Sequence, residues 1–373
     1  MKQLALLLIL IMSLFLGTAV HAQDEQTPYD IALARILEAE ATGATSLELG
    51  YLGLNQIPPE IRNLTDLQDL YLGSNPLNTL PSEIGNLSNL QNLFLDNNNL
   101  SSLPPEIGNM TSLRNLSLGG NNLTTLPSEI GNLTNLTVLN LGANNLNSLP
   151  PEISYLTNLH TLYLNDNNLS SLPPEISNLH TLYLSSNNLS SLPSEIGNLN
   201  NLNSLSLDYN NLSSLPHEIG NLTNLRDLSL SGNNLTTLPP EIGNLTNLRG
   251  LYLHDNNLNS VPPEIGNLGN LLHLHLYEND LHNLPDSIGE LEALIYLRIF
   301  DNPLTLLPEE IRMADTATIQ AYLRNRAAWH FKRMVMGIVS AIGVLSVFIL
   351  VLRVRYHQVR GKSKRKREDI TVS

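Results

Sequence analysis

The residues best suited to chemistry are three histidines and two carboxylates near the C-terminal end of a long repeated region. His254, His273 and His275 fall close together, and Asp255 and Glu278 are their near neighbours in the sequence. Imidazole and carboxylate side chains are both ligands for divalent transition metals. His273 and His275 alternate on one predicted strand, where same-face neighbours are about 6.8 Å apart, and adjacent strands lie about 4.8 Å apart. This spacing is loose for a closed metal site, so the pattern favours a solvated polar patch and we assign no metal.

Sequence motifs for catalysis are missing. The chain contains no GxxxxGK[ST], HExxH or GxSxG pattern and no cysteine, and its many serines mostly fill the same slots of a repeat. The sequence therefore predicts a protein that is not an enzyme and that uses no cofactor. A column of glutamates could form a cation-binding edge, but each one recurs at the same point of the repeat, which favours a shared role in folding. This column consists of Glu60, Glu83, Glu106, Glu129, Glu152, Glu175, Glu195, Glu218, Glu241 and Glu264.

The element that must position these residues is a 23-residue phrase, LxxLxLxxNxLxxLPxEIGNLxN, which recurs from Leu67 to about Ile311. In the copy that starts at Leu113, Leu116 and Leu118 alternate with polar residues or glycine, which is the period of a short strand with one buried face. An asparagine follows each strand, and its amide can satisfy backbone groups in the turns of neighbouring coils. Successive asparagines are 23 residues apart except for one step of 20. They are Asn75, Asn98, Asn121, Asn144, Asn167, Asn187, Asn210, Asn233, Asn256, Asn279 and Asn302.

The second half of the phrase predicts the return side of each coil. Pro127 cannot donate a hydrogen bond to a sheet ladder, and Glu129 lies where a carboxylate favours a short helical turn. A period of 20–29 residues with this leucine and asparagine pattern is the signature of a leucine-rich repeat. Residues 44–312 therefore resemble the leucine-rich repeat family. The wording LPxEIGNLxN is most similar to intracellular scaffold-type repeats and to bacterial arrays, including those of Roco proteins, although no GTPase follows here.

The resemblance implies an α/β solenoid, namely a curved horseshoe of about twelve coils with a parallel sheet on its concave side. It also implies that the asparagine ladder is buried and structural, and that helical caps cover both ends. A helix is predicted over residues 29–42, with Tyr29, Leu33, Ile36 and Leu37 along its apolar face. Residues 317–323 resemble the C-terminal cap of such bacterial arrays.

The concave face is the predicted ligand-binding surface, because strand side chains that the core does not use point toward it. The slot between the paired strand leucines holds an aromatic or charged residue in some coils and serine or asparagine in others, so folding does not require the aromatics. Exposed aromatic side chains carry much of the energy at interfaces, although tyrosine also simply suits a strand surface. We predict two contact areas, one around Tyr163 and Tyr183 and a stronger one from Tyr252 to Phe300. The candidate residues are Tyr71, Phe94, Tyr163, Tyr183, Tyr252, His254, Asp255, His273, His275, Tyr277, Glu278, Arg298 and Phe300.

The charge of the chain is divided unevenly. The net charge is −14, yet residues 23–352 hold 11 Lys/Arg against 32 Asp/Glu, whereas residues 353–373 hold eight Lys/Arg against two Asp/Glu. A nucleic-acid-binding protein needs a basic surface. The acidic body therefore argues against a nucleic-acid partner.

The two ends of the chain predict membrane attachment. Residues 1–22 have the features of a signal peptide, with the uncleaved anchor as the alternative, and residues 23–43 form the N-terminal segment and cap helix. After a cap and stalk over residues 313–333, Met334–Leu352 contains 19 residues without a charge, long enough to cross about 30 Å of hydrocarbon as a helix. The positive-inside rule then places the basic tail, residues 353–373, in the cytoplasm. We expect a single-pass type I protein of the cell membrane with its repeats outside.

The expected function is recognition, adhesion or scaffolding through a protein partner bound on the concave face. A glycan-binding surface module is the alternative from a different class. A spacer without a single ligand is the third reading.

Overall fold

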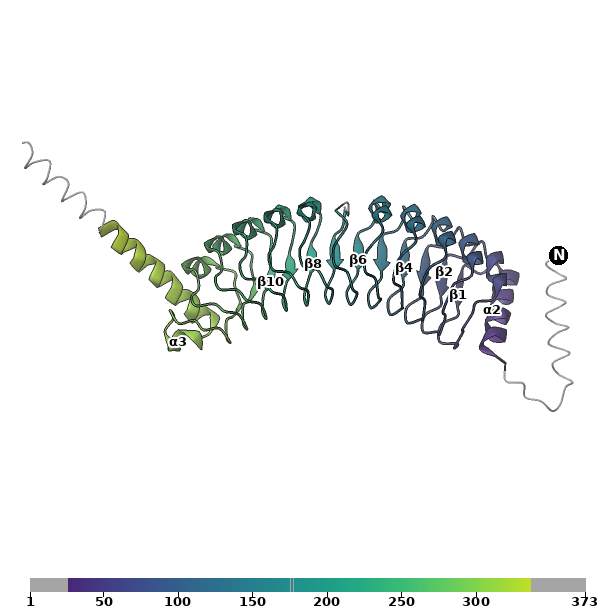
Figure 1. The fold of residues 1–373 in the computed structure, drawn as a ribbon, viewed down its shortest axis with the longest axis horizontal. Helices are drawn as coiled ribbons and strands as arrows, with labels where there is room; N and C mark the ends of the chain where they lie inside the picture. Colours follow the sequence, from purple (N-terminus) through teal and green to yellow (C-terminus); the bar gives the residue numbers. More distant parts are fainter. Residues whose placement is uncertain (1–25, 175, 177, 337–373) are drawn as a thin grey trace, which may run out of the picture.

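The structure is a computed structural model that describes residues 26–336 except 175 and 177. Its coils stack side by side into one curved array, with short helical turns along the outer rim (Figure 1). Each coil contributes one strand of three residues. The strands are β1 (Ser46–Glu48), β2 (Asp69–Tyr71), β3 (Asn92–Phe94), β4 (Asn115–Ser117), β5 (Val138–Asn140), β6 (Thr161–Tyr163), β7 (Thr181–Tyr183), β8 (Ser204–Ser206), β9 (Asp227–Ser229), β10 (Gly250–Tyr252), β11 (His273–His275) and β12 (Tyr296–Arg298).

These strands form one parallel sheet in which each strand pairs with the strands of the coils before and after it. The register aligns equivalent residues, so Leu93 of β3 pairs with Leu70 of β2 and with Leu116 of β4. The middle residue of every strand is buried, because a single strand has only one face toward the core. The leucines of successive coils join one continuous hydrophobic core. The predicted solenoid with a parallel sheet is confirmed.

The turn after each strand depends on a buried asparagine. Asn121 Nδ2 donates to the backbone oxygens of Leu95 (3.0 Å), in the preceding coil, and Leu118 (2.9 Å), and its Oδ1 accepts from the backbone N–H of Leu100 (3.0 Å). One amide thus satisfies backbone groups of two coils that water cannot reach. The first coil has Leu52 at this position, and Asn75 of the next coil accepts from its backbone N–H at 3.1 Å.

The return side carries short 3₁₀ turns of five residues, each beginning just after a proline. The stacked turns approach so closely that a Cβ on Gly131 would lie 2.7 Å from the backbone oxygen of Glu152 in the next coil. This approach explains why glycine recurs in the phrase. The 20-residue coil between β6 and β7 has no such turn among its described residues. The turns are η1 (Pro59–Asn63), η2 (Ser82–Asn86), η3 (Pro105–Asn109), η4 (Ser128–Asn132), η5 (Pro151–Tyr155), η6 (Ser194–Asn198), η7 (His217–Asn221), η8 (Pro240–Asn244), η9 (Pro263–Asn267) and η10 (Asp286–Glu290).

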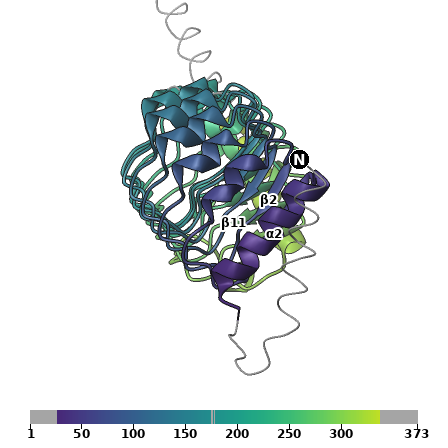
Figure 2. The same ribbon diagram turned by 90° about the vertical axis from the view of Figure 1, so that its right-hand side faces the viewer.

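Helix α2 (Pro28–Thr42) covers the open end of the first coil (Figure 2). It begins with a capping box in which Thr27 and Asp30 exchange hydrogen bonds, and it ends at Gly43, whose φ is 67°. The predicted apolar face is partly right, because Ile36 is buried as expected but Leu37 is exposed, and Ala32 and Ala39 complete the buried side. Small alanine side chains let the helix backbone lie close to the first coil.

The other end is covered by α3 (Glu309–Arg312) and by a helix over residues 316–336. Ile319 and Leu323 of this longer helix are buried, and Gln320 Nε2 donates to the backbone oxygen of Leu291 at 2.7 Å. Within residues 26–336, apart from 175 and 177, no helix combines the length and apolar character needed to cross a bilayer. The predicted signal peptide, most of Met334–Leu352 and the basic tail lie outside the described residues.

Candidate ligand-binding face

The outer side chains of the strands form columns of aligned residues, because the register is constant along the sheet. Two of the predicted aromatic pairs are stacked within these columns. Tyr71 and Phe94 have ring centroids 5.0 Å apart and planes 8° apart, and Tyr163 and Tyr183 have centroids 5.1 Å apart and planes 9° apart. Both pairs are half-buried at the surface of the sheet. Each pair therefore presents a flat apolar contact surface beside polar neighbours.

Hydrogen-bonded polar side chains separate these two pairs. Ser117 Oγ donates to Asp96 Oδ1 at 2.6 Å, and Asn140 Nδ2 donates to the same oxygen at 3.2 Å. A second network surrounds Asp208, which accepts from Ser206 Oγ at 2.9 Å and from the backbone N–H of Ser231 at 2.9 Å. Since these groups satisfy one another, the middle of the sheet offers fewer unpaired groups to a ligand.

The last coils of the sheet carry a larger group of rings. Tyr277 is stacked between His254 (centroids 4.3 Å apart) and Phe300 (4.5 Å), so that three consecutive coils contribute one ring each. A second contact joins Tyr252 to His275 edge-on at 5.0 Å. A third contact pairs His273 with Tyr296. We call all these rings the C-terminal aromatic cluster: Tyr252, His254, His273, His275, Tyr277, Tyr296 and Phe300.

The sequence reasoning missed Tyr296, which stacks on His273 with centroids 5.2 Å apart and is 51% exposed. The signal was available, since Tyr296 follows His273 by one full repeat. The reasoning also missed the reason that Tyr252 lies flat on the sheet. Gly250 lies beneath it, and a Cβ there would be 2.8 Å from Tyr252 Cε2.

The three histidines do not assemble a metal site. His254 and His275 have ring centroids 6.3 Å apart, and His254 Nδ1 is 2.8 Å from Ser231 Oγ. In the part of the chain that the structure describes, no three His, Asp or Glu side chains come close enough to hold a metal ion. The histidines instead act as flat rings within the aromatic columns.

Burial opposes the charging of several side chains in the cluster. The pKa of His275 is lowered to about 4, first by desolvation and then by the positive charge of Arg298, which pairs with it in the register. Desolvation also lowers the pKa of His254 and raises the pKa values of Tyr252 and Tyr277. Desolvation thus disfavours the charged forms of these four side chains.

The carboxylates next to the cluster lie on the turn that follows each strand. Asp255, Glu278 and Asp301 are exposed and directly follow His254, Tyr277 and Phe300 in the chain. All three have φ between 51° and 56°. The same left-handed conformation occurs at the equivalent turn of every coil, including Gly120 and Gly232, so the geometry belongs to the repeat and not to the acids.

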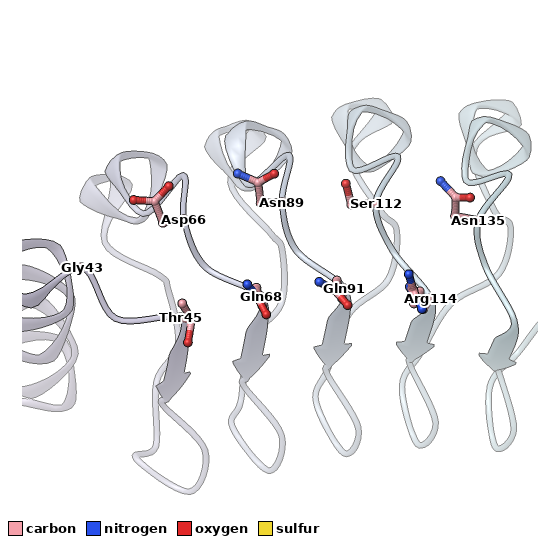
Figure 3. Close-up of a pocket in the computed structure, with 9 residues that line it drawn as sticks. All are labelled: Gly43, Thr45, Asp66, Gln68, Asn89, Gln91, Ser112, Arg114 and Asn135. Atoms are coloured by element: carbon pink, nitrogen blue, oxygen red, sulfur yellow. The ribbon is translucent and has the colours of Figure 1, made fainter.

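A separate polar groove of about 640 Å³ runs along the N-terminal ends of the strands over the first coils (Figure 3). The sequence reasoning did not find it, because its residues vary from coil to coil. Gln68, Gln91 and Arg114 each lie one residue before a strand and line this groove. Asn89 Nδ2 and Asn135 Nδ2 are engaged with the backbone oxygens of Thr65 and Thr111, at 2.8 and 2.9 Å. The groove contains amide, guanidinium and carboxylate groups but no aromatic ring.

Comparison with known proteins identifies the family. The family described as "Leucine-rich repeat region" matches residues 45–142, 112–183, 178–251 and 217–302. The chain belongs to the leucine-rich repeat family. No curated protein sequence matches it.

Several solved leucine-rich repeat structures are similar to this chain. A leucine-rich repeat protein of Leptospira interrogans is 40% identical, with a TM-score of 0.61 over 71% of this chain and 75% of that one. An internalin of Listeria monocytogenes is 25% identical, with a TM-score of 0.58 over 75% of this chain and 91% of that one. The plant peptide hormone receptor RGFR1, in complex with RGF2, is 28% identical, with a TM-score of 0.55 over 72% of this chain and 53% of that one.

Proposed function

We propose that this leucine-rich repeat protein is anchored in the cell membrane and binds a protein partner on the concave face of its sheet. The observation that carries the proposal is the C-terminal aromatic cluster, whose rings gather on one face although other coils fill the same positions with serine or glycine. Aromatic side chains that are flat and partly exposed are typical anchors of protein interfaces. A structurally similar receptor, solved in complex with RGF2, supports a role in binding.

The membrane part of the proposal is supported by the sequence alone. Residues 1–22 have the features of a signal peptide, Met334–Leu352 is free of charge, and eight Lys/Arg follow it. In this arrangement the repeats are outside the cell, and residues 353–373 are in the cytoplasm. The basic tail either binds anionic lipid or serves only as the stop-transfer flank.

A glycan-binding module remains the second candidate, and the polar groove favours it. Gln68, Gln91 and Arg114 offer donors and acceptors at the edge of the sheet, which suits a ligand with many hydroxyl groups. Against this candidate, aromatic rings that could stack on sugars are missing from that groove, and they lie instead on the sheet face.

The experiment that separates these candidates is capture with the full-length protein in detergent, tested in parallel against native surface proteins and a glycan array. We expect the unchanged protein to capture a surface protein. The variant in which Tyr252 and Tyr277 are both changed to alanine should no longer capture it. Glycan binding that depends on Gln68 and Gln91, without any protein captured by the sheet face, would replace this proposal with the second candidate.

A further inference from the structure

The C-terminal aromatic cluster lies in a strongly acidic part of the sequence. Residues 250–311 contain ten Asp/Glu and a single Lys/Arg, Arg298. Asp255, Glu278 and Asp301 follow one another on consecutive coils, each directly after a ring of the stack. The only salt bridges among the described residues involve other side chains, so none of these three carboxylates is neutralised by a cation in the structure.

Folding does not require acids at these three positions. The equivalent turn residue is Ser74 in one coil, Ala143 in another and glycine in two more, all with positive φ. A glutamate at φ 54°, as at Glu278, is less favourable there than glycine would be. Like charges at equivalent turns of adjacent coils also repel one another. Three acids in a row therefore oppose the stability of the array without a compensating contact.

Folding does not require the rings either. The positions of His254, Tyr277 and Phe300 are occupied by Gly73, Gly119 and Gly142 in earlier coils. Phe300 closes the stack, and its side chain is 46% exposed. One side of Phe300 packs on Tyr277, and among residues 301–336 no aromatic ring stacks on the other side. Such a ring can contact the guanidinium or ammonium group of Arg or Lys through a cation–π interaction, and it can pack against the aliphatic stem of the same side chain.

We propose that the C-terminal aromatic cluster is the docking site for a positively charged protein segment, whose Lys or Arg side chains lie over the rings and pair with Asp255, Glu278 and Asp301. The inference rests on the proposed function and names the chemistry of the partner. Charge complementarity selects this occupant, since an acidic segment would meet three unpaired carboxylates and a neutral one would leave them unpaired. Arg298, on the strand side of the rings, can donate hydrogen bonds to an acidic or carbonyl group of the segment and so fix its orientation.

The test uses the full-length protein and three short labelled peptides. They share one tyrosine-containing sequence and differ only in carrying Lys, Glu or Gln at the same positions. Binding is measured by fluorescence anisotropy at low and at high salt, and the bound region is located by hydrogen exchange. We expect the Lys peptide to bind at least about tenfold more tightly than the Glu peptide, to weaken with salt, and to protect residues 250–301.

The decisive variant combines Asp255→Asn, Glu278→Gln and Asp301→Asn. It should weaken binding of the Lys peptide at least about tenfold. The matched control combines Glu38→Gln, Asp66→Asn and Glu195→Gln, which removes the same charge at exposed positions outside residues 250–311 and should leave binding unchanged. Thermal unfolding of both variants checks that each remains folded.

The outcomes separate this inference from the proposed function. Equal binding of the Lys, Glu and Gln peptides, or equal losses in the two triple variants, would overturn the basic partner. If a captured protein then still requires Tyr252 and Tyr277, the proposed function stands without it. If the captured protein ignores both tyrosines, the sheet face is not the binding surface, and the proposed function fails as well.

Discussion

The ring of Phe300 stacks on that of Tyr277, with centroids 4.5 Å apart and planes 13° apart, although 23 residues separate them in the chain. The repeat period brings equivalent residues of consecutive coils into contact, so any ring repeated at this interval becomes part of a column. Each coil therefore adds one residue to each column of the sheet surface, and a change at one position mainly affects the residues of its own and the adjacent coils.

The first prediction concerns the binding surface. Changing Tyr252 and Tyr277 together to alanine should weaken binding of the captured partner at least tenfold, about 1.4 kcal/mol, because both rings belong to the cluster. Loss of the stacking contacts should cost about 0.5–1.5 kcal/mol of stability per pair, which leaves the array folded. The control changes Tyr51 and Tyr155, which are 85% and 61% exposed and lie away from the cluster. A larger loss from the control, or from Glu129→Lys on the return side, would place the interface elsewhere.

The second prediction concerns the asparagine ladder. Asn167 Nδ2 donates to the backbone oxygens of Leu141 and Leu164, at 2.9 and 3.1 Å, and Oδ1 accepts from Leu146 N–H at 2.9 Å. Asn167→Leu should therefore lower the free energy of unfolding by about 1–3 kcal/mol for each group left unsatisfied. The exposed neighbour supplies the control, since Asn168→Leu leaves this network intact. Urea unfolding compares the two, and equal midpoints would show that the ladder amide is dispensable.

The third prediction concerns the stacked turns on the return side. Gly131→Ala should lower the free energy of unfolding by about 1–3 kcal/mol, because the new methyl would lie 2.7 Å from the backbone oxygen of Glu152. Gly269→Ala is the matched control, since a Cβ there meets nothing within 4 Å. The effect is read from thermal unfolding. Indistinguishable melting temperatures would mean that the turns can move apart at little cost.

The fourth prediction concerns pH. Desolvation, followed by Arg298, His254 and His273, holds the pKa of folded His275 at about 4, below the unfolded value of 6.5. Between these two values the unfolded chain binds more protons than the folded one, so stability must fall as pH is lowered through this window. The loss is moderated by solvent, since the ring is only half-buried. His275→Gln should flatten the dependence of the melting temperature on pH between about 6.5 and 4. The imidazole titration, followed by NMR, should show the lowered pKa directly, and a titration near 6.5 would contradict it.

The fifth prediction concerns topology. A protease added to intact cells should remove the repeats and spare residues 353–373, because the positive-inside rule retains that basic tail in the cytoplasm. Tags at the two ends of the mature chain, probed before and after permeabilisation, give the readout. Repeats that resist the protease until the membrane is opened would reverse the proposed orientation.

The sequence alone determined the architecture of this protein. A leucine at the middle of each strand and an asparagine at each turn make the same local demands in every coil, and a coil can meet those demands only by stacking on another. Leu116 and Asn121 therefore indicate the sheet, its parallel direction and the solenoid without knowledge of any distance. Pro127 likewise indicates where the chain leaves the sheet.

The tertiary structure decided how the variable positions combine. Stacking sets which rings touch, so the contacts of Tyr277 with His254 and Phe300 depend on the register between coils. It also sets the buried side of α2, where Ala39 faces the first coil and Leu37 does not. The groove beside Gln68 and Gln91 emerges only when neighbouring coils are placed side by side. The repeat period indicates which residues share a column, but side-chain orientation, contacts between columns and the packing of the cap are decided by the three-dimensional arrangement of the coils.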